Sequence, residues 1–322
     1  MSSLENTIKE LYTYLPPLTK RPDFDQFWSD TLKEAWGVNL NATVKQYDYP
    51  SPYVKVYEIE YNGFDTTPIH GWYIVPDFLK KDKYPCLINY HGFGGDRGMP
   101  ADFMAWCMMG MAVISVDCRE QSGKTGNSAT FTSGMTGNVA CKGVLNKNEY
   151  YYRAVIMDCI KAIDFANSRP EIDADKIVIH GISQGGALGM AVCSLDSRPT
   201  LAMVDVPSSS NLEVRVEGAY GSFSSITEYL KKYPYQLEKV YETLSYFDTM
   251  NMADKIKCRV FASVALKDNV CPAKCYFATY NRITAPKEIR IYPFNGHEGG
   301  HAIHFEEKLK FLKSSGFLEH KE

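Results

Sequence analysis

The fold is decided by the stretch KIVIHGISQGG at residues 176–186. A β-rich apolar run leads into Gly181-x-Ser183-x-Gly185, and a segment of small residues with helical character follows. Small residues on both sides of a serine permit the sharp, strained turn that lifts its hydroxyl above a sheet. The stretch therefore predicts a strand, a tight turn and a helix, with Ser183 as a nucleophile. The simpler alternative is a glycine-rich turn with an incidental serine.

A serine nucleophile needs a base, and the base needs a carboxylate that orients it. For a serine on such a turn, the expected chain order is serine, acid, histidine, with both partners in loops after later strands. Asp268 follows the predicted strand 259–266, and His297 follows the predicted strand 288–293. We therefore predict Asp268 and His297 as the catalytic partners of Ser183.

Other residues compete for these roles. Asp205 ends an earlier predicted strand, a position from which some hydrolases take their acid. His301 and His304 follow the predicted base closely, but they enter the final predicted helix, so we expect them at the surface or behind the site. A surface histidine and a capping aspartate are the simpler interpretations of the predicted pair. Their joint occurrence after strands, in the expected order, argues against these.

An acyl-transfer site also needs donors for the oxyanion, one after the nucleophile and one after an early strand. The backbone N–H of Gln184 is the first candidate. The second is the backbone N–H of Phe93, in the loop HGFGG at residues 91–95, whose glycines allow close approach of a substrate. His91 opens this loop and is expected to shape it.

Short apolar runs alternate with longer helical patterns from about residue 85 onward, which predicts an α/β, doubly wound, mostly parallel sheet. Residues 54–61 and 69–75 precede it as a β-hairpin. We expect one domain over residues 1–322, with an N-terminal extension at 1–50 and a helical insertion over the active site at 208–251. The predicted strands are 85–90, 112–116, 176–180, 201–206, 259–266 and 288–293; the predicted helices are 149–167, the segment after Ser183, 272–282 and 302–314.

Composition excludes several classes of function. The formal net charge is −3 and no basic stripe is present, which argues against nucleic-acid binding. No secretory signal or membrane-spanning stretch is apparent, so we expect a cytoplasmic protein with no membrane partner. The nine cysteines are expected to be reduced and buried, Cys271 and Cys275 among them, because two thiols make a poor zinc site. Nucleotide-binding motifs are absent, so we expect no cofactor and no metal.

The chain resembles carbohydrate esterase family 7, the acetyl xylan esterases and cephalosporin C deacetylases, along nearly its whole length. The likeness begins at PDFDQFW, residues 22–28, and extends to the C-terminal helix. Its further markers are His91-Gly92-Phe93, Arg119-Glu120-Gln121, LNKNEYYYR at 145–153, Gly181 to Gly186, TLSYFD at 243–248, DNVCP at 268–272 and His297-Glu298.

The resemblance implies an α/β-hydrolase fold and the same site: Ser183 as nucleophile, Asp268 as acid, His297 as base, and the amides of Phe93 and Gln184 as the oxyanion hole. It implies deacetylation of small acetylated sugars such as xylo-oligosaccharides, and of cephalosporin C. It also implies a homohexamer with its active sites facing an inner cavity.

The sequence departs from this family at three places. Glu120 stands where the family usually has glycine, Phe93 where a tyrosine is common, and Ser222-Phe223 where the family has Pro-Tyr. These changes leave every predicted catalytic group in place and are expected to alter substrate choice.

Two other functions remain open at this stage. One is a peptidase or an esterase for longer acyl chains on the same fold. The other is a binding protein without catalysis, because this fold hosts many functions.

Overall fold

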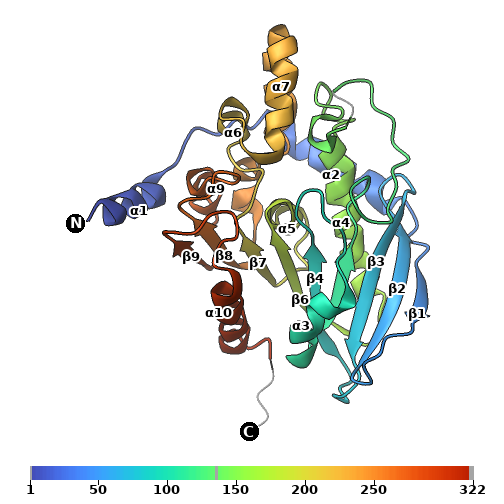
Figure 1. The fold of residues 1–322 in the computed structure, drawn as a ribbon. Helices are drawn as coiled ribbons and strands as arrows, with labels where there is room; N and C mark the ends of the chain where they lie inside the picture. The colour runs from blue at the N-terminus through green and yellow to red at the C-terminus, as the bar shows by residue number, and fades with distance from the viewer. Residues whose placement is uncertain (1, 135–136, 319–322) are drawn as a thin grey trace.

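The computed structural model describes residues 2–134 and 137–318. Its centre is a sheet with the strand order β1-β2-β3-β5-β4-β6-β7-β8-β9 (Figure 1). The strands from β5 to β9 are parallel, whereas β1, β2 and β3 form an antiparallel edge. The bounds are β1 Thr43–Tyr47, β2 Val54–Asn62, β3 Pro68–Pro76, β4 Tyr84–Tyr90, β5 Ala112–Val116, β6 Ile172–Ile182, β7 Leu201–Asp205, β8 Arg259–Ala265 and β9 Lys287–Tyr292.

The predicted α/β, mostly parallel sheet is therefore confirmed, and each predicted strand overlaps an observed strand in sequence. Strand β1 was not predicted. All five of its residues are exposed, so it lacks the apolar alternation that reveals a half-buried strand. It pairs with β2 at the edge of the sheet.

Helices cover both faces of the sheet, as a doubly wound fold requires. The helices α2, α4, α5 and α9 contribute to the larger hydrophobic core on one face, and α3 and α10 to the smaller core on the other. The bounds are α1 Ser3–Thr13, α2 Phe24–Trp36, α3 Met104–Met108, α4 Tyr151–Asn167, α5 Gln184–Leu195, α6 Leu212–Glu217, α7 Ser224–Lys232, α8 Leu237–Ser245, α9 Ala273–Tyr280 and α10 His301–Ser314.

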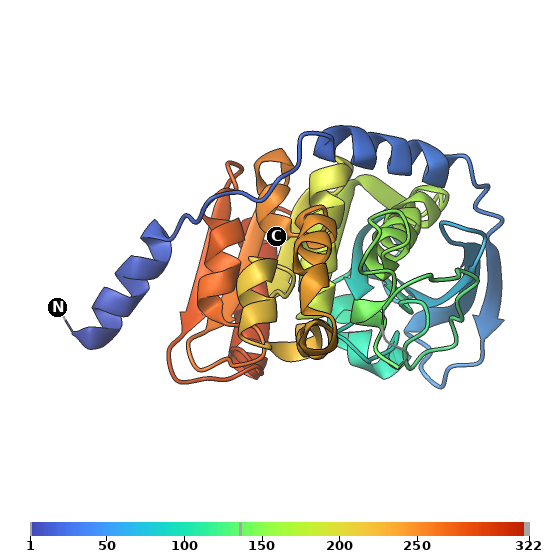
Figure 2. The same ribbon diagram turned by 90° about the horizontal axis from the view of Figure 1, so that it is seen from above.

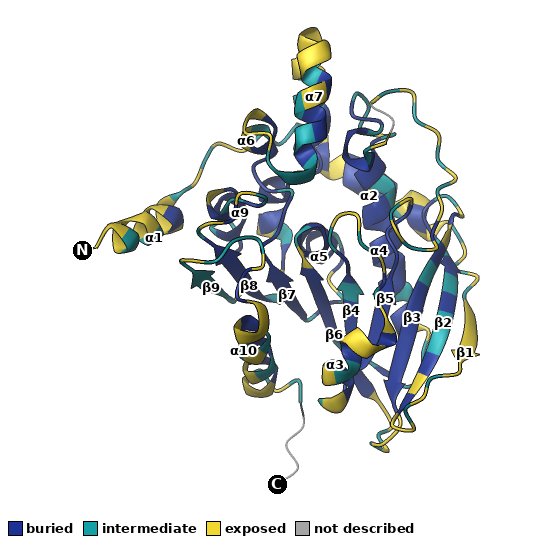
Figure 3. Cartoon of the chain, viewed as in Figure 1, coloured by how far each residue is buried: buried dark blue, intermediate teal, exposed yellow. Residues whose placement is uncertain are grey.

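The two cores follow from the alternation of side chains along buried strands. In β4, Cys86 and Ile88 face the larger core, while Leu87 between them faces the smaller one. In β6, Ile177 and Val178 divide in the same way. Figure 3 shows the central strands as the most buried part of the molecule. Because both faces are covered, these strands carry apolar side chains on both faces rather than only at every second position.

The N-terminal segment crosses the molecule before the sheet begins. Helix α1 projects from the body beside α9, and an extended stretch leads from it to α2 on the far side (Figure 2). Asn281 Nδ2 donates to the backbone oxygens of Leu11 and Tyr14, at 2.9 and 2.8 Å, and so attaches α1 to the end of α9. In α2, Trp28 Nε1 donates to the Tyr246 carbonyl at 3.0 Å.

Helices α6, α7 and α8 occupy the span between β7 and β8, where the sequence predicts a helical insertion. Asp248 anchors the start of this insertion, because its carboxylate accepts from the backbone N–H groups of Asn211 and Leu212 at 2.9 and 2.6 Å. Among the described residues, the helices are too short or too polar for a membrane span.

Candidate active site

Ser183 lies on a strained turn between β6 and α5. Its backbone has φ 57° and ψ −115°, in a region that side-chain-bearing residues rarely adopt. The turn is possible because its neighbours are glycines. A Cβ on Gly185 would lie 1.8 Å from the Tyr90 carbonyl oxygen, and one on Gly181 would lie 2.3 Å from the carbonyl carbon of Gly185. The sequence motif therefore has a steric cause.

The structure brings the three predicted catalytic side chains together. His297 Nε2 lies 3.1 Å from Ser183 Oγ, and His297 Nδ1 lies 2.8 Å from Asp268 Oδ2. Asp268 follows β8 and its carboxylate is buried, whereas the His297 side chain, after β9, is 32% exposed. The histidine thus has one side against a fixed carboxylate and another open to a leaving group.

The loop after β8 holds Asp268 in one orientation. Its Oδ1 accepts from the backbone N–H groups of Val270 and Cys271, both at 2.8 Å, which leaves Oδ2 for His297. Cys271 is buried as expected, and its Sγ lies 3.8 Å from Ser183 Oγ.

The competing residues form a separate cluster. Asp205 Oδ1 lies 2.7 Å from His304 Nε2, and its Oδ2 accepts from Lys308 Nζ at 2.6 Å. Although burial alone would raise it, the pKa of Asp205 is held far below its usual range by the charge of Lys308 and the hydrogen bond with His304. His304 is only 2% exposed and lies behind the site, whereas His301 is exposed at the start of α10. Through its backbone oxygen, Asp205 also accepts from Ser183 N at 2.9 Å.

The sheet order brings together the two segments that carry the predicted oxyanion donors. Strand β4 pairs directly with β6, so the loop after β4 lies beside the turn that carries Ser183. Gln184 is the first residue of α5, where N–H groups have no partner within the helix. The loop with Phe93 is closed by a 3.0 Å bond from Gly95 N to the Gly92 carbonyl. The Phe93 side chain is 39% exposed.

His91 shapes this loop, as its position suggests. Its Nδ1 lies 2.7 Å from the Gly92 carbonyl, and its Nε2 lies 2.8 Å from the backbone N–H of Cys118, which must donate to it. Both ring nitrogens are therefore used, and His91 joins the loop after β4 to the loop after β5.

Gln121 supports the site in a way that motif spacing does not reveal. Its Oε1 accepts from Gly94 N at 2.7 Å, and its Nε2 donates to Gln184 Oε1 at 3.1 Å. The same oxygen of Gln184 accepts from the Tyr152 hydroxyl at 2.9 Å. Gln121 therefore links the two backbone segments that carry the predicted oxyanion donors. Only the family likeness had singled it out.

Glu120, one of the departures from the family pattern, adopts φ 57°. A glycine accepts this conformation readily, whereas other residues are strained in it. Glu120 makes an ion pair with Lys142 and accepts from Asn127 Nδ2 at 2.8 Å. Although burial opposes the shift, these two partners lower the pKa of Glu120.

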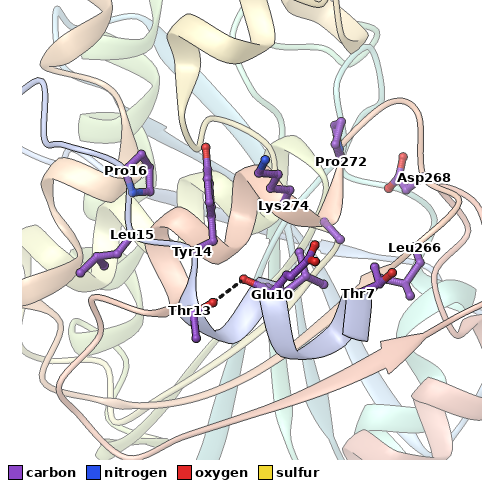
Figure 4. A pocket seen from close by; sticks show the side chains of 12 residues that line it. Thr7, Glu10, Thr13, Tyr14, Leu15, Pro16, Leu266, Asp268, Pro272 and Lys274 are labelled. Carbon is purple, nitrogen blue, oxygen red and sulfur yellow. Dashed lines mark hydrogen bonds between the residues drawn. The ribbon is translucent and has the colours of Figure 1, made fainter. Parts of the chain in front are cut away.

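A cavity of about 570 Å³ has Leu266 and Asp268 among its lining residues. Figure 4 shows it between α1 and the start of α9, with Asp268 and Thr7 at one end and Leu15 and Pro16 at the other. Ser183 and His297 are not among its lining residues, so it is distinct from the space above the nucleophile.

The fold and the arrangement of this site define a serine esterase of the α/β-hydrolase class. The model of the acetyl xylan esterase family (AXE1) matches residues 1–315, and the chain belongs to that family.

Several solved and characterised relatives agree with this assignment. The acetyl xylan esterase from Paenibacillus sp. R4 is 40% identical, with a TM-score of 0.92 over 95% of this chain and 98% of that one. Acetyl xylan esterase 1 from Thermoanaerobacterium sp. JW/SL YS485 is 27% identical, with a TM-score of 0.89 over the same shares. The acetyl esterase Axe7A of Xylanibacter ruminicola is 29% identical over 88% of this chain, and the match spans 65% of that longer protein.

Proposed function

We propose that this protein removes acetyl groups from small acetylated carbohydrates, xylo-oligosaccharides among them, by a Ser-His-Asp acyl-enzyme mechanism. The observation that carries the proposal is the hydrogen-bonded chain from Ser183 Oγ through His297 to Asp268, in a chain of the acetyl xylan esterase family.

In the first step, Ser183 Oγ attacks the acetyl carbonyl carbon while His297 Nε2 takes the hydroxyl proton. Asp268 Oδ2 accepts from His297 Nδ1–H, which keeps Nε2 free as the base and stabilises the imidazolium that forms. The carbonyl oxygen becomes an oxyanion and accepts from the backbone N–H groups of Phe93 and Gln184. One such donor is typically worth ~3 kcal/mol in the transition state.

In the second step, the imidazolium gives its proton to the sugar oxygen, and the bond between that oxygen and the acetyl carbon breaks. The deacetylated sugar leaves on the side of His297, whose side chain is 32% exposed whereas that of Asp268 is buried. Water then attacks the acetyl-enzyme with His297 as base, and acetate and free Ser183 result. Each proton has a named donor and acceptor, and water is the only co-reactant.

The Ser183→Ala variant tests the mechanism. It should lose at least ~10³-fold in turnover of p-nitrophenyl acetate while keeping its circular dichroism and melting temperature. Full activity in a folded variant would refute the assignment. Labelling by a fluorophosphonate probe should occur in the wild type and disappear in the variant, and failure to label the wild type would favour a non-catalytic binding protein.

Acyl-chain length separates this proposal from an esterase of broader range or a peptidase. We expect kcat/KM to fall steeply from acetyl to butyryl esters. Equal rates on octanoyl esters, or cleavage of a peptide amide, would favour the alternative. Acetate release should also be measured from a panel of acetylated xylo-oligosaccharides, acetylated monosaccharides and cephalosporin C. The rates would show which alcohol part of the ester the enzyme prefers.

The family resemblance also leads us to propose cephalosporin C as a substrate and a homohexamer as the assembly. Light scattering tests the second point directly, because a hexamer of this 36.4 kDa chain is far larger than a monomer. A monomer at working concentration would refute it.

A further inference from the structure

The thiol of Cys271 lies against the nucleophile, yet neither catalytic step uses it. Its Sγ lies 3.8 Å from Ser183 Oγ, and the residue is 3% exposed. Burial raises the pKa of this thiol, so it stays protonated near neutral pH and does not act as a second nucleophile. Its contact with Ser183 is therefore one of packing rather than of chemistry.

The backbone around Cys271 is held on both sides. Its own N–H donates to Asp268 Oδ1 at 2.8 Å, and the preceding carbonyl, that of Val270, accepts from Arg215 Nη2 at 3.0 Å. Arg215 belongs to α6 and is 1% exposed, so the insertion contacts this loop directly. The next residue, Pro272, has a fixed φ and is the N-cap of α9. A side chain on a loop held in this way has little freedom to move aside.

Three of the four groups around the attacked carbon already have a direction. In the tetrahedral intermediate this carbon carries Ser183 Oγ, the oxyanion, the leaving sugar oxygen and the acyl chain. The oxyanion points to its proposed donors, the N–H groups of Phe93 and Gln184, on the side of β4. The leaving oxygen points to His297 Nε2, which lies 3.1 Å from Oγ. The acyl chain takes the remaining direction.

The position of Cys271 matches that remaining direction. Among the described side chains, those of His297 and Cys271 form hydrogen bonds with Ser183 Oγ. The loop of Cys271 follows β8, which lies on the opposite side of β6 from β4. The thiol therefore lies away from the proposed oxyanion donors, on the side left for the acyl chain.

The short distance between the nucleophile and the thiol limits the length of this chain. A separation of 3.8 Å is already van der Waals contact, so no further carbon fits between the two side chains. An acetyl group ends in a single methyl group, whereas propionyl and butyryl groups extend by one and two more carbons. We expect these longer groups to collide with Sγ.

We propose that Cys271 is a specificity-determining residue whose side chain closes the acyl side of the site and restricts the enzyme to acetyl esters. The inference rests on the proposed function and deepens it, because it assigns the expected fall in kcat/KM from acetyl to butyryl esters to one side chain. One methylene more or less in an apolar pocket typically changes kcat/KM by about 10- to 200-fold. A wall at this position is therefore sufficient to select acetyl esters.

Shortening the side chain of Cys271 tests the proposal. The value of kcat/KM is measured for p-nitrophenyl acetate, propionate and butyrate, with Ser183→Ala protein as the blank for spontaneous hydrolysis. We expect Cys271→Ala to raise the propionate-to-acetate ratio of kcat/KM by about tenfold, the lower end of the effect of one methylene. Cys271→Gly should raise the butyrate-to-acetate ratio as well. Both variants keep the backbone N–H that donates to Asp268.

Control variants separate acyl recognition from a structural role. Cys275→Ala removes a second thiol that is also 3% exposed, in α9, and should keep the wild-type ratios. Cys271→Ser nearly keeps the size of the side chain, so its ratios should lie closer to the wild type than those of Cys271→Ala. Unchanged ratios in folded Cys271→Ala and Cys271→Gly would overturn the inference, because a distorted site slows all three esters together. An equal rise in Cys275→Ala would also overturn it.

Covalent labelling gives a second readout that needs no release of the acyl group. In 4-nitrophenyl alkylphosphonates the alkyl group stands in for the acyl chain. Ser183 Oγ bonds to phosphorus, His297 takes the serine proton, and 4-nitrophenolate leaves. The ethyl-to-methyl ratio of the labelling rates should rise about tenfold in Cys271→Ala, and a ratio equal to that of the wild type would contradict the proposal. Failure of the proposed function would appear separately, as no turnover of p-nitrophenyl acetate by the wild type.

Discussion

Replacing Asp268 with asparagine should disable the site by changing the tautomer of His297. The two backbone N–H groups of Val270 and Cys271 donate to Asp268 Oδ1, each at 2.8 Å. An asparagine must therefore place its oxygen on that side, because its NH₂ group would oppose two donors there. The NH₂ group then faces His297 Nδ1, which can only accept from it.

The consequence is a proton on the wrong ring nitrogen. Nδ1 loses its hydrogen and Nε2 gains one, so the atom 3.1 Å from Ser183 Oγ can no longer accept the serine proton. Loss of the correct tautomer in a Ser-His-Asp site costs about 10⁴ in kcat, or ~5.5 kcal/mol in the activation free energy. Binding contacts with the substrate are unchanged, so KM should vary by less than about threefold.

The assay is the turnover of p-nitrophenyl acetate by Asp268→Asn, with circular dichroism and the melting temperature as controls for folding. Asp175→Asn, at an exposed strand position, serves as the matched control and should keep wild-type kcat. A folded Asp268→Asn enzyme with kcat within tenfold of the wild type would refute the reasoning.

Three further predictions concern the framework of the site. Gly185→Ala should lower stability by ~3 kcal/mol or more and reduce activity, because its Cβ would lie 1.8 Å from a carbonyl oxygen at the end of β4; an unchanged melting temperature would contradict this. Lys308→Met should cost about 3–5 kcal/mol in chemical unfolding, because it leaves the buried Asp205 carboxylate without its 2.6 Å partner. Lys310→Met removes an exposed ion pair and should change the free energy of unfolding by less than ~0.5 kcal/mol. Equal losses of stability in Lys308→Met and Lys310→Met would show that the buried pair is worth no more than the exposed one. Burial, together with the charge of Lys308, lowers the pKa of His180 from 6.5 to about 3. The pKa of His180 is lower in the folded protein than in the unfolded chain. The stability that comes from burying the neutral imidazole is therefore complete above pH 6.5 and is lost as the pH falls toward 3, by as much as ~4 kcal/mol. Residue 180 of His180→Gln cannot titrate, so as the pH falls from 6.5 toward 3 the free energy of unfolding of this variant should rise relative to that of the wild type. A difference that stays constant with pH would contradict the lowered pKa of His180.

Much of this molecule could be predicted from neighbouring residues in the chain. The turn at Ser183 needs glycine at Gly181 and Gly185 because their Cβ positions are filled by backbone, and that requirement is visible as a motif. Most of the parallel strands could be predicted because burial on both faces makes them mostly apolar. Strand β1 was not predicted from the sequence because it is exposed along its whole length.

The pairing of the charged side chains needed the tertiary structure. Asp205 ends β7 and Asp268 follows β8, yet only the loop after β8 brings a carboxylate 2.8 Å from His297, while Asp205 pairs with Lys308. Arg215 lies on the short helix α6, and only the packed structure shows that it is 1% exposed and that its Nε and Nη1 have no hydrogen-bond partner among the described residues. Local sterics and periodicity are determined by adjacent residues, whereas charge pairing depends on which distant loops the strand order places together.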